Sequence, residues 1–156
     1  MGITIKQHVD YWLKGSAENM ADMRSNVKSN RRVIALFCGH LALEKMLKAL
    51  CAVRNIQIGQ IHKLADLADS AGLNLSLTQR AELISITGLN IAARYDDYKM
   101  IFHKQCTPQY TAIWVKCITA WYKQLKPMSP GETRNPSVTR FFRGYTVLFW
   151  VFACHV

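Results

Sequence analysis

The sequence predicts an all-α protein, an up-and-down bundle of four to five helices. Apolar residues recur at the 3.6-residue spacing of a helix within the stretches 4–27, 31–53, 76–87 and 107–125. No stretch before residue 137 alternates between apolar and polar residues with the period of two that marks a half-buried strand. Capping signals mark several helix ends, and no internal repeat is visible. Amphipathic helices of this kind bury their apolar faces against one another in a bundle.

Two long helices are expected in the first third of the chain. The first runs from about Thr4 to Val27. Ser29 and Asn30 break it, and the second helix follows over residues 31–53. The inward stripe of the first helix is expected to contain Tyr11, Trp12, Met20, Met23 and Val27.

Shorter helices with clear end signals follow a predicted loop over residues 54–61. Residues 62–70 predict a short helix, and Gly72 stands after it, where glycine is favoured because it adopts the left-handed conformation. Ser76 and Gln79 then form the Ser-x-x-Gln pattern of a capping box. This pattern predicts a helix that continues to about residue 87.

The segment before the last helix is less regular. Residues 88–103 combine helix-forming and charged residues and are expected to form a loop or an irregular helix start, exposed at one end of the bundle. Thr107 as N-cap and Pro108 at the first helical position then begin a helix through Leu125. Its inward aromatic stripe is expected to be core rather than a base-stacking platform, and contains Tyr110, Trp114 and Trp121.

Composition places the chain among globular proteins. A length of 156 residues supports one domain, and an apolar fraction of 50% excludes a disordered chain. The formal net charge of +10 is compatible with an RNA, DNA or nucleotide partner, and equally with a basic surface that only confers solubility. We therefore assign residues 1–126 to a helical bundle and residues 127–156 to a proline-containing linker and apolar tail of unknown role.

The cysteines and the N-terminus indicate a cytoplasmic protein. Five cysteines without a Cys-x-x-Cys pair favour reduced thiols over a disulfide framework, and those at positions 38, 51 and 117 fall at apolar helical positions. The first residues lack the long apolar stretch of a secretory signal. The apolar run at 145–154 is about half the length that a membrane-spanning helix needs. A membrane-spanning helix is therefore not expected there, and no membrane partner is predicted. The tail could pack on the bundle, pair between subunits or lie at a membrane surface.

A polar stripe runs along the otherwise apolar second helix. His40, Glu44 and Lys48 are spaced at i, i+4 and i+8 and so lie on one face. Because buried polar groups need hydrogen-bond partners, another segment has to supply them, and residues 90–99 are the best candidate. His40 and Glu44 are also spaced as two metal ligands, but no third or fourth ligand is visible, so a satisfied buried pair is preferred and no metal is expected.

Five segments of the chain together resemble the HEPN family of small helical bundles, over roughly residues 7–126. In this family Pro commonly follows the Arg-Tyr pair, whereas Asp96 stands there in this chain. The resemblance implies an all-α bundle. It rests on Tyr11-Trp12-Leu13, the block from His40 through Glu44 and Lys48 to Leu50, Ile61-His62-Lys63-Leu64, Ala93-Arg94-Tyr95 with Asp97-Tyr98-Lys99, and Phe102 with Cys106-Thr107-Pro108.

One activity that the resemblance implies is metal-independent cleavage of RNA. Many HEPN proteins use an Arg and a His with four to six residues between them, where two subunits meet. By this likeness Arg94 and His103 are the candidate catalytic pair, and Glu44 orients Arg94. His serves as general acid or base, and Arg neutralises charge on the phosphate. Eight residues separate the pair here, so on one straight helix the two side chains would point about 180° apart.

The second implied role is non-catalytic. HEPN modules of this kind bind a nucleotide, RNA or a partner protein and often accompany a small nucleotidyltransferase, as a two-gene toxin–antitoxin or regulatory pair. In some such pairs the transferase modifies a tyrosine, for which Tyr95 or Tyr98 would be the counterpart here. The resemblance also implies a homodimer and no cofactor. The candidate nucleotide- or RNA-binding residues are His40, Lys48, Arg94, Tyr95, Tyr98 and Lys99.

Two further interpretations of the same residues stay open. Arg94 can pair with Glu44 or cap helix carbonyls in a purely structural role. The chain can also be a scaffold whose tail mediates association. The eight-residue spacing favours the binding module over the ribonuclease.

Overall fold

The computed structural model describes residues 2, 4–95 and 99–129. These residues form six α-helices, one 3₁₀ turn and no strand, which confirms the all-α class. The count exceeds the predicted four to five because residues 101–105 form a separate five-residue helix. The elements are α1 (Ile5–Lys28), α2 (Arg32–Val53), α3 (Leu64–Ser70), α4 (Leu77–Arg94), α5 (Ile101–Gln105), α6 (Pro108–Leu125) and η1 (Lys126–Met128).

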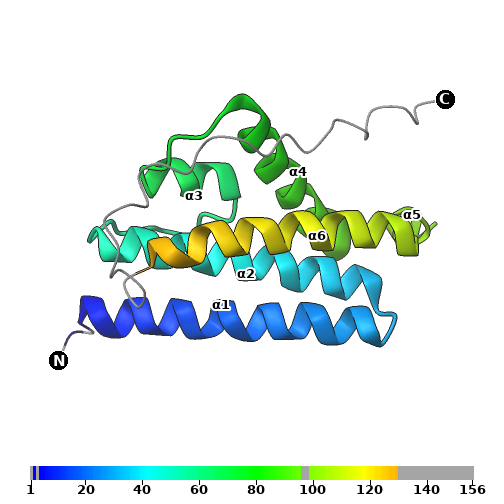
Figure 1. Cartoon of the computed structure of the whole chain (residues 1–156), viewed down its shortest axis with the longest axis horizontal. Coiled ribbons are helices and arrows are strands. Elements are labelled where there is room, and N and C mark those ends of the chain that lie inside the picture. Colours follow the sequence, from blue (N-terminus) through cyan, green and yellow to red (C-terminus); the bar gives the residue numbers. More distant parts are fainter. Residues whose placement is uncertain (1, 3, 96–98, 130–156) are drawn as a thin grey trace.

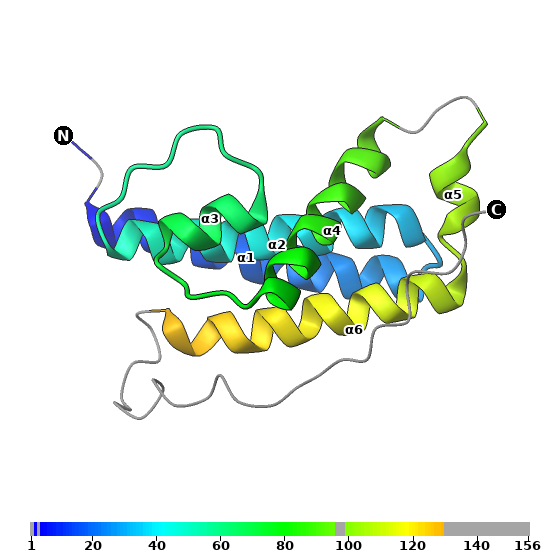
Figure 2. The same cartoon turned by 90° about the horizontal axis from the view of Figure 1, so that it is seen from above.

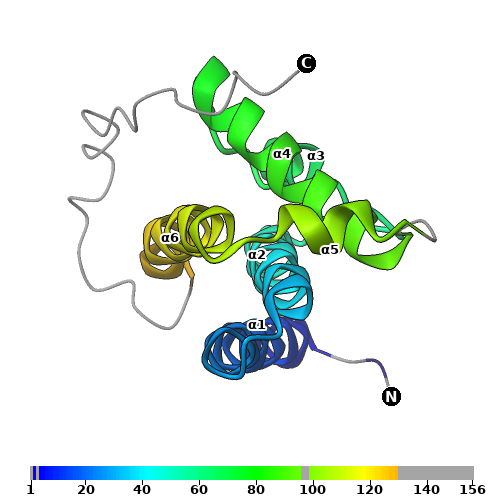
Figure 3. The same cartoon turned by 90° about the vertical axis from the view of Figure 1, so that its right-hand side faces the viewer.

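Helix α2 is the centre of the bundle. Viewed end-on, it is surrounded by α1, α6 and the α3–α4 layer (Figure 3). Helices α1, α2 and α6 share the long axis of the molecule (Figure 1), and α4 crosses α2 obliquely (Figure 2). Because neighbours cover α2 on several sides, its polar stripe is buried together with its apolar residues.

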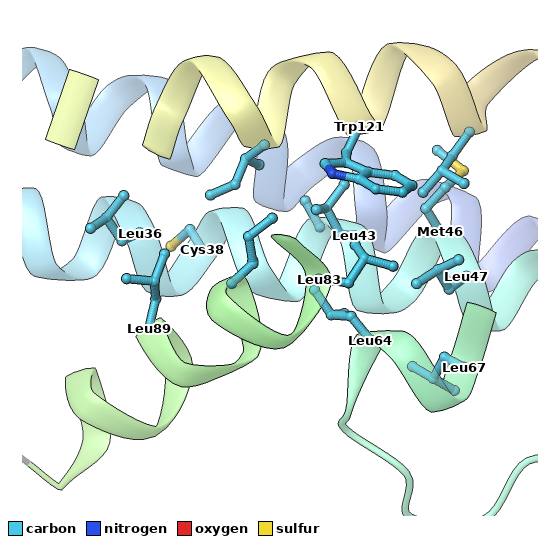
Figure 4. Packing of buried hydrophobic residues seen from close by; sticks show 14 of the residues in the cluster. Leu36, Cys38, Leu43, Met46, Leu47, Leu64, Leu67, Leu83, Leu89 and Trp121 are labelled. Atoms are coloured by element: carbon cyan, nitrogen blue, oxygen red, sulfur yellow. The ribbon is translucent and has the colours of Figure 1, made fainter. Parts of the chain in front are cut away.

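The core forms where α2 meets α3, α4 and α6 (Figure 4). Each fully buried leucine stabilises the fold by about 1.5–3 kcal/mol relative to an exposed one. Side chains that meet there are Leu36, Leu43, Met46 and Leu47 of α2, Leu64 and Leu67 of α3, Leu83 and Leu89 of α4, and Trp121 of α6.

Gly39 allows α1, α2 and α6 to approach one another closely. A Cβ at this position would lie 2.8 Å from Sδ of Met23 in α1 and 2.8 Å from Cδ1 of Ile118 in α6. Glycine inside a helix costs about 1 kcal/mol relative to alanine. Here the close packing of three helices offsets that cost.

The predicted capping chemistry is confirmed at both later helices. Ser76 accepts from the backbone N–H of Gln79 at 3.2 Å, and the Gln79 side chain accepts from the Ser76 N–H at 2.9 Å. Thr107 caps α6 through the N–H of Tyr110 at 3.2 Å, with Pro108 as the first helical residue. Gly72 follows α3 with a φ of +67°.

The loop or irregular helix start expected over residues 88–103 is wrong for residues 88–94, which are helical. Helix α4 continues past residue 87 to Arg94, because Leu89 and Asn90 are buried against the bundle and keep the helical period. Met100, with a φ of 51°, lies in the left-handed region before α5. The chain from Arg94 to His103 is therefore not one straight helix.

Two residues of the expected α1 stripe also face outward. Tyr11 is 66% exposed and Val27 is 39% exposed, whereas Met20 and Met23 are buried as predicted. The true inward face of α1 includes Val9 and Ser16. Ser16 was not expected there because it is polar, and its hydroxyl donates to the carbonyl of Ala42 at 2.6 Å.

Within the described residues, no helix is both long and apolar enough to cross a membrane. The predicted linker begins at η1, which ends at Met128, and residues 130–156 of the predicted tail lie outside the described part of the chain.

Candidate functional site

The polar stripe of α2 lies in the interior. His40 has no exposed surface, Glu44 is 4% exposed and Lys48 is 9% exposed. The prediction that other segments supply hydrogen-bond partners is confirmed. Asn90 comes from the expected segment, but the main partner is His62, which precedes α3.

Glu44 is the hub of the cluster. Its Oε1 accepts from Nζ of Lys48 at 2.8 Å and from Nδ1 of His62 at 3.0 Å. The Lys48 ammonium also lies 5.1 Å from the ring centroid of Trp12, on α1. A buried carboxylate requires such compensation, because an unpaired charge in the interior is strongly destabilising.

His40 ties the loop before α3 to α2. Its Nε2 lies 3.2 Å from the carbonyl oxygen of His62, so this nitrogen carries a proton and donates. The side chain of Asn90 lies 3.4 Å from the same nitrogen. Because that nitrogen donates, the Asn90 amide is best oriented with its oxygen toward the ring, where it accepts.

Burial keeps His40 neutral. Its pKa falls to about 4, chiefly because the charged ring would lose its hydration, while the nearby Glu44 carboxylate opposes the fall. The positive charges of His62 and Arg94 add to the lowering. Nδ1 of neutral His40 is then an acceptor, and it lies 3.7 Å from Oε2 of Glu44, another acceptor, with neither atom hydrogen-bonded in the described part of the chain.

Arg94 lies at the exposed C-terminal end of α4, one turn after Asn90. Its guanidinium carbon is 5.3 Å from the ring centroid of Tyr95, which is 73% exposed. Among the described residues no carboxylate pairs with Arg94, and Glu44 bonds Lys48 and His62 instead. Of the other predicted binding residues, Lys99 is exposed, and Tyr98 lies outside the described residues.

His103, the second member of the predicted catalytic pair, lies on α5. It lines a cleft of about 540 Å³ beside the turn between α1 and α2. Nη1 of Arg32, which also lines this cleft, donates to the carbonyl of Cys106 at 3.3 Å. Arg94 is not among the residues that line it, which are Asn30, Arg31, Arg32, Val33, Ile34, His103 and Cys106.

Two cysteines of the described ranges hold protonated thiols. Burial raises the pKa of Cys51 to about 11 and that of Cys117 to about 12, which keeps both thiols protonated near neutral pH. Among the residues that the structure describes, no group of three or more His, Cys, Asp or Glu side chains could hold a metal ion.

The sequence interpretation missed the role of His62. A histidine at a helix start is most often a cap or a core residue, but the His62 side chain is 55% exposed and bonds a buried carboxylate. The sequence did indicate that the polar stripe of α2 needs hydrogen-bond partners from another segment. A partner 18 residues away across a loop cannot be placed from spacing alone.

A comparison of the chain with protein families identifies its family. The model of the HEPN domain matches residues 9–123, so the chain belongs to the HEPN domain family. Neither the curated proteins nor the solved structures contain a match to the chain. Family membership supports a nucleotide- or RNA-associated module in general terms.

Proposed function

We propose that this chain is a HEPN-domain module that binds RNA or a nucleotide through the end of α4 and the buried cluster beneath it. The observation that carries the proposal is that buried His40 contacts both the His62 carbonyl and the side chain of Asn90, which lies one turn before the exposed Arg94 on α4. A cationic group held on a rigid element next to an aromatic ring suits a phosphate and a base. The net charge of +10 favours the same partners.

The predicted binding residues take two roles in this proposal. Arg94, Tyr95 and Lys99 are exposed and contact the ligand, together with Tyr98. His40 and Lys48 are buried and hold the cluster in place, since each is hydrogen-bonded within it.

Binding is tested with the full chain by fluorescence anisotropy, using a labelled single-stranded RNA and, separately, a labelled nucleotide. Arg94→Ala is expected to weaken binding about tenfold or more, as the loss of one charge-assisted phosphate contact predicts. Arg24→Ala is the matched control, because Arg24 is an exposed arginine of α1, on the far side of α2 from α4 (Figure 3). Equal weakening by both variants would refute a site at Arg94.

We further propose that the module is one component of a two-gene toxin–antitoxin or regulatory pair with a nucleotidyltransferase. The exposed Tyr95 beside Arg94 is accessible to such an enzyme. Co-expression with a nucleotidyltransferase partner is expected to give a stable complex and a nucleotide-sized mass increase, which Tyr95→Phe abolishes. An unmodified protein that does not co-purify with the transferase would contradict this pairing.

A homodimer fits an exposed apolar stripe on α4. Leu77, Ile84 and Ile91 are spaced by seven residues, lie on one face, and are 89%, 58% and 52% exposed. Such a stripe, left uncovered in one chain, favours self-association through a twofold interface.

The alternative function is a metal-independent endoribonuclease that uses Arg94 and His103. One observation favours keeping it. The backbone between these residues turns at Met100, which has a φ of 51°, so the two side chains are not on opposite faces of one helix. Growth arrest on expression, relieved by Arg94→Ala, would support this alternative.

A further inference from the structure

A basic cleft opens at the end of the bundle where the turn between α1 and α2 faces α5 (Figure 1 and Figure 2). Its volume of about 540 Å³ lies within the range of ligand pockets in proteins. Arg31, Arg32 and His103 line it, and none of the described residues that line it is acidic. This cleft therefore presents positive charge in a concave site.

The two arginines of the cleft have no carboxylate partner among the described residues. Arg32 is nevertheless held in place, because its Nη1 donates to the carbonyl of Cys106 at 3.3 Å. A guanidinium has several N–H donors, so this single bond leaves others for a ligand. Arg31 is exposed beside it. Guanidinium groups that the fold positions but does not neutralise suit an oxyanion supplied from outside.

Acidic residues are missing from the segments that form this end of the bundle. Residues 23–43 and 99–129 contain neither Asp nor Glu. Exposed lysines stand close to the cleft residues along the chain, at Lys28 and Lys104. The summed field at this end therefore attracts a negatively charged partner and repels a basic one.

The first turn of α2 offers backbone donors to the same anion. Its N-cap, Arg31, makes no side-chain capping hydrogen bond. The N–H groups from Arg32 to Ile34 have no acceptor within the helix and none in the turns around it, among the described residues. Carboxylate oxygens are preferred acceptors at such positions. A carboxylate in the cleft can thus accept from guanidinium groups and from backbone N–H groups together.

Apolar side chains of the cleft distinguish a peptide from a nucleic acid. Val33, Ile34 and Cys106 line it beside the arginines, and Ile34 is 46% exposed. No Phe, Tyr or Trp is among the described residues that line it. Single-stranded nucleic acids bind mainly where bases stack on such rings. An aliphatic wall beside arginines instead suits a peptide that carries acidic and aliphatic side chains.

We propose that this cleft binds an acidic peptide segment of a partner protein, in which carboxylate side chains stand next to an aliphatic residue. A carboxylate accepts from Arg31, Arg32 and the first N–H groups of α2, and the aliphatic side chain packs on Ile34. None of these residues belongs to the RNA site proposed at Arg94, so either proposal can fail without the other.

The test uses the full chain and a short fluorescein-labelled peptide in which Asp and Glu surround one leucine, followed by fluorescence anisotropy. Arg31→Ala is expected to weaken binding about tenfold or more, as the loss of one charge-assisted contact predicts. Arg32→Lys keeps the charge but loses the planar fork, and it is also expected to weaken binding. A peptide with Asn and Gln in place of the acids is expected not to bind.

Arg24→Ala is the matched control, because Arg24 is an exposed arginine of α1 that does not line the cleft. It is expected to change the affinity by less than about twofold, since distant surface charges are screened by salt. Far-UV circular dichroism checks that each variant is folded. Absence of peptide binding, or equal weakening by Arg31→Ala and Arg24→Ala, would overturn the proposal.

Ile34→Ser tests the apolar wall. It is expected to weaken the leucine peptide about fivefold, and to leave unchanged the affinity for a peptide with serine in place of the leucine. Equal effects on both peptides would overturn the contact between Ile34 and the aliphatic residue.

Amide chemical shifts of the ¹⁵N-labelled full chain locate the peptide. Shift changes are expected at residues 30–34 and 103–106, with the amide protons of Val33 and Ile34 moving downfield as they bond a carboxylate. Single-stranded RNA that shifts these residues, and displaces the peptide even from the Arg94→Ala variant, would make the cleft a nucleic-acid site. That result would overturn the assignment to an acidic peptide.

Discussion

Acidification is expected to destabilise the protein through His40. Its pKa is about 4 in the folded protein, against an ordinary value of 6.5. Below pH 6.5 the unfolded chain therefore binds a proton that the folded protein does not. The free energy of unfolding consequently decreases as the pH is lowered. The stabilisation is complete above pH 6.5 and is lost as the pH falls to about 4. At about 1.4 kcal/mol per pH unit, the loss is about 3 kcal/mol.

The groups around His40 determine the sign of this effect. Burial is the largest cause of the lowered pKa. Glu44 of the same helix and the hydrogen bond to the His62 carbonyl oppose it, while the charges of the His62 ring and Arg94 reinforce it. A loss of about 3 kcal/mol is a large share of the 5–15 kcal/mol that stabilises an ordinary domain.

The assay is urea unfolding, followed by far-UV circular dichroism at pH 7, 6, 5 and 4 and constant ionic strength. His40→Gln is the comparison, because the neutral amide does not titrate and can still donate to the His62 carbonyl. It is expected to be less stable than the wild type by about 1 kcal/mol at pH 7. Between pH 7 and pH 4, the free energy of unfolding of the variant should then rise by about 3 kcal/mol relative to that of the wild type. Parallel curves for the two proteins would refute a buried, neutral His40.

Other substitutions test the packing and the surface. Gly39→Ala is expected to lower the free energy of unfolding by about 1–3 kcal/mol in urea titrations, because its Cβ would meet Met23 and Ile118. A Cβ at Gly88 would have nothing within 4 Å, so Gly88→Ala is expected to raise the free energy of unfolding by up to about 1 kcal/mol. If Gly39→Ala were the more stable of the two variants, the close packing around Gly39 would be contradicted. Ser16→Ala is expected to cost about 1 kcal/mol in the same assay, through the lost bond to the Ala42 carbonyl. Ile84→Glu is expected to convert a dimer to a monomer in light scattering, and an unchanged mass would place the interface elsewhere.

Local chemistry explains which parts of the fold the sequence predicts. The N-caps Ser76 and Thr107 bond amides three residues ahead, so their helices begin where the pattern indicates. The end of α4 depends on tertiary contacts. Gly88 and the charged residues after it suggest an interruption, but burial of Leu89 and Asn90 against the bundle extends the helix.

The sequence likewise predicts the positions of some residues of the candidate site and not of others. Spacing within one helix was enough to place His40, Glu44 and Lys48 on one face. The identity of their partner depends on where the loop before α3 returns to α2, which no local pattern encodes. The sequence therefore does not single out His62 as this partner, and the pairing of Arg94 with His103 rests on the family likeness rather than on a local pattern.

The most direct test of a site around Glu44, His62 and Arg94 is a titration of the ¹⁵N-labelled full chain with single-stranded RNA, followed by amide chemical shifts. Shift changes are expected to cluster at residues 61–64 and 89–95, around the buried anchor His40. A cluster at residues 30–34 and 103–106 instead would place RNA in the cleft that His103 lines and would contradict the account.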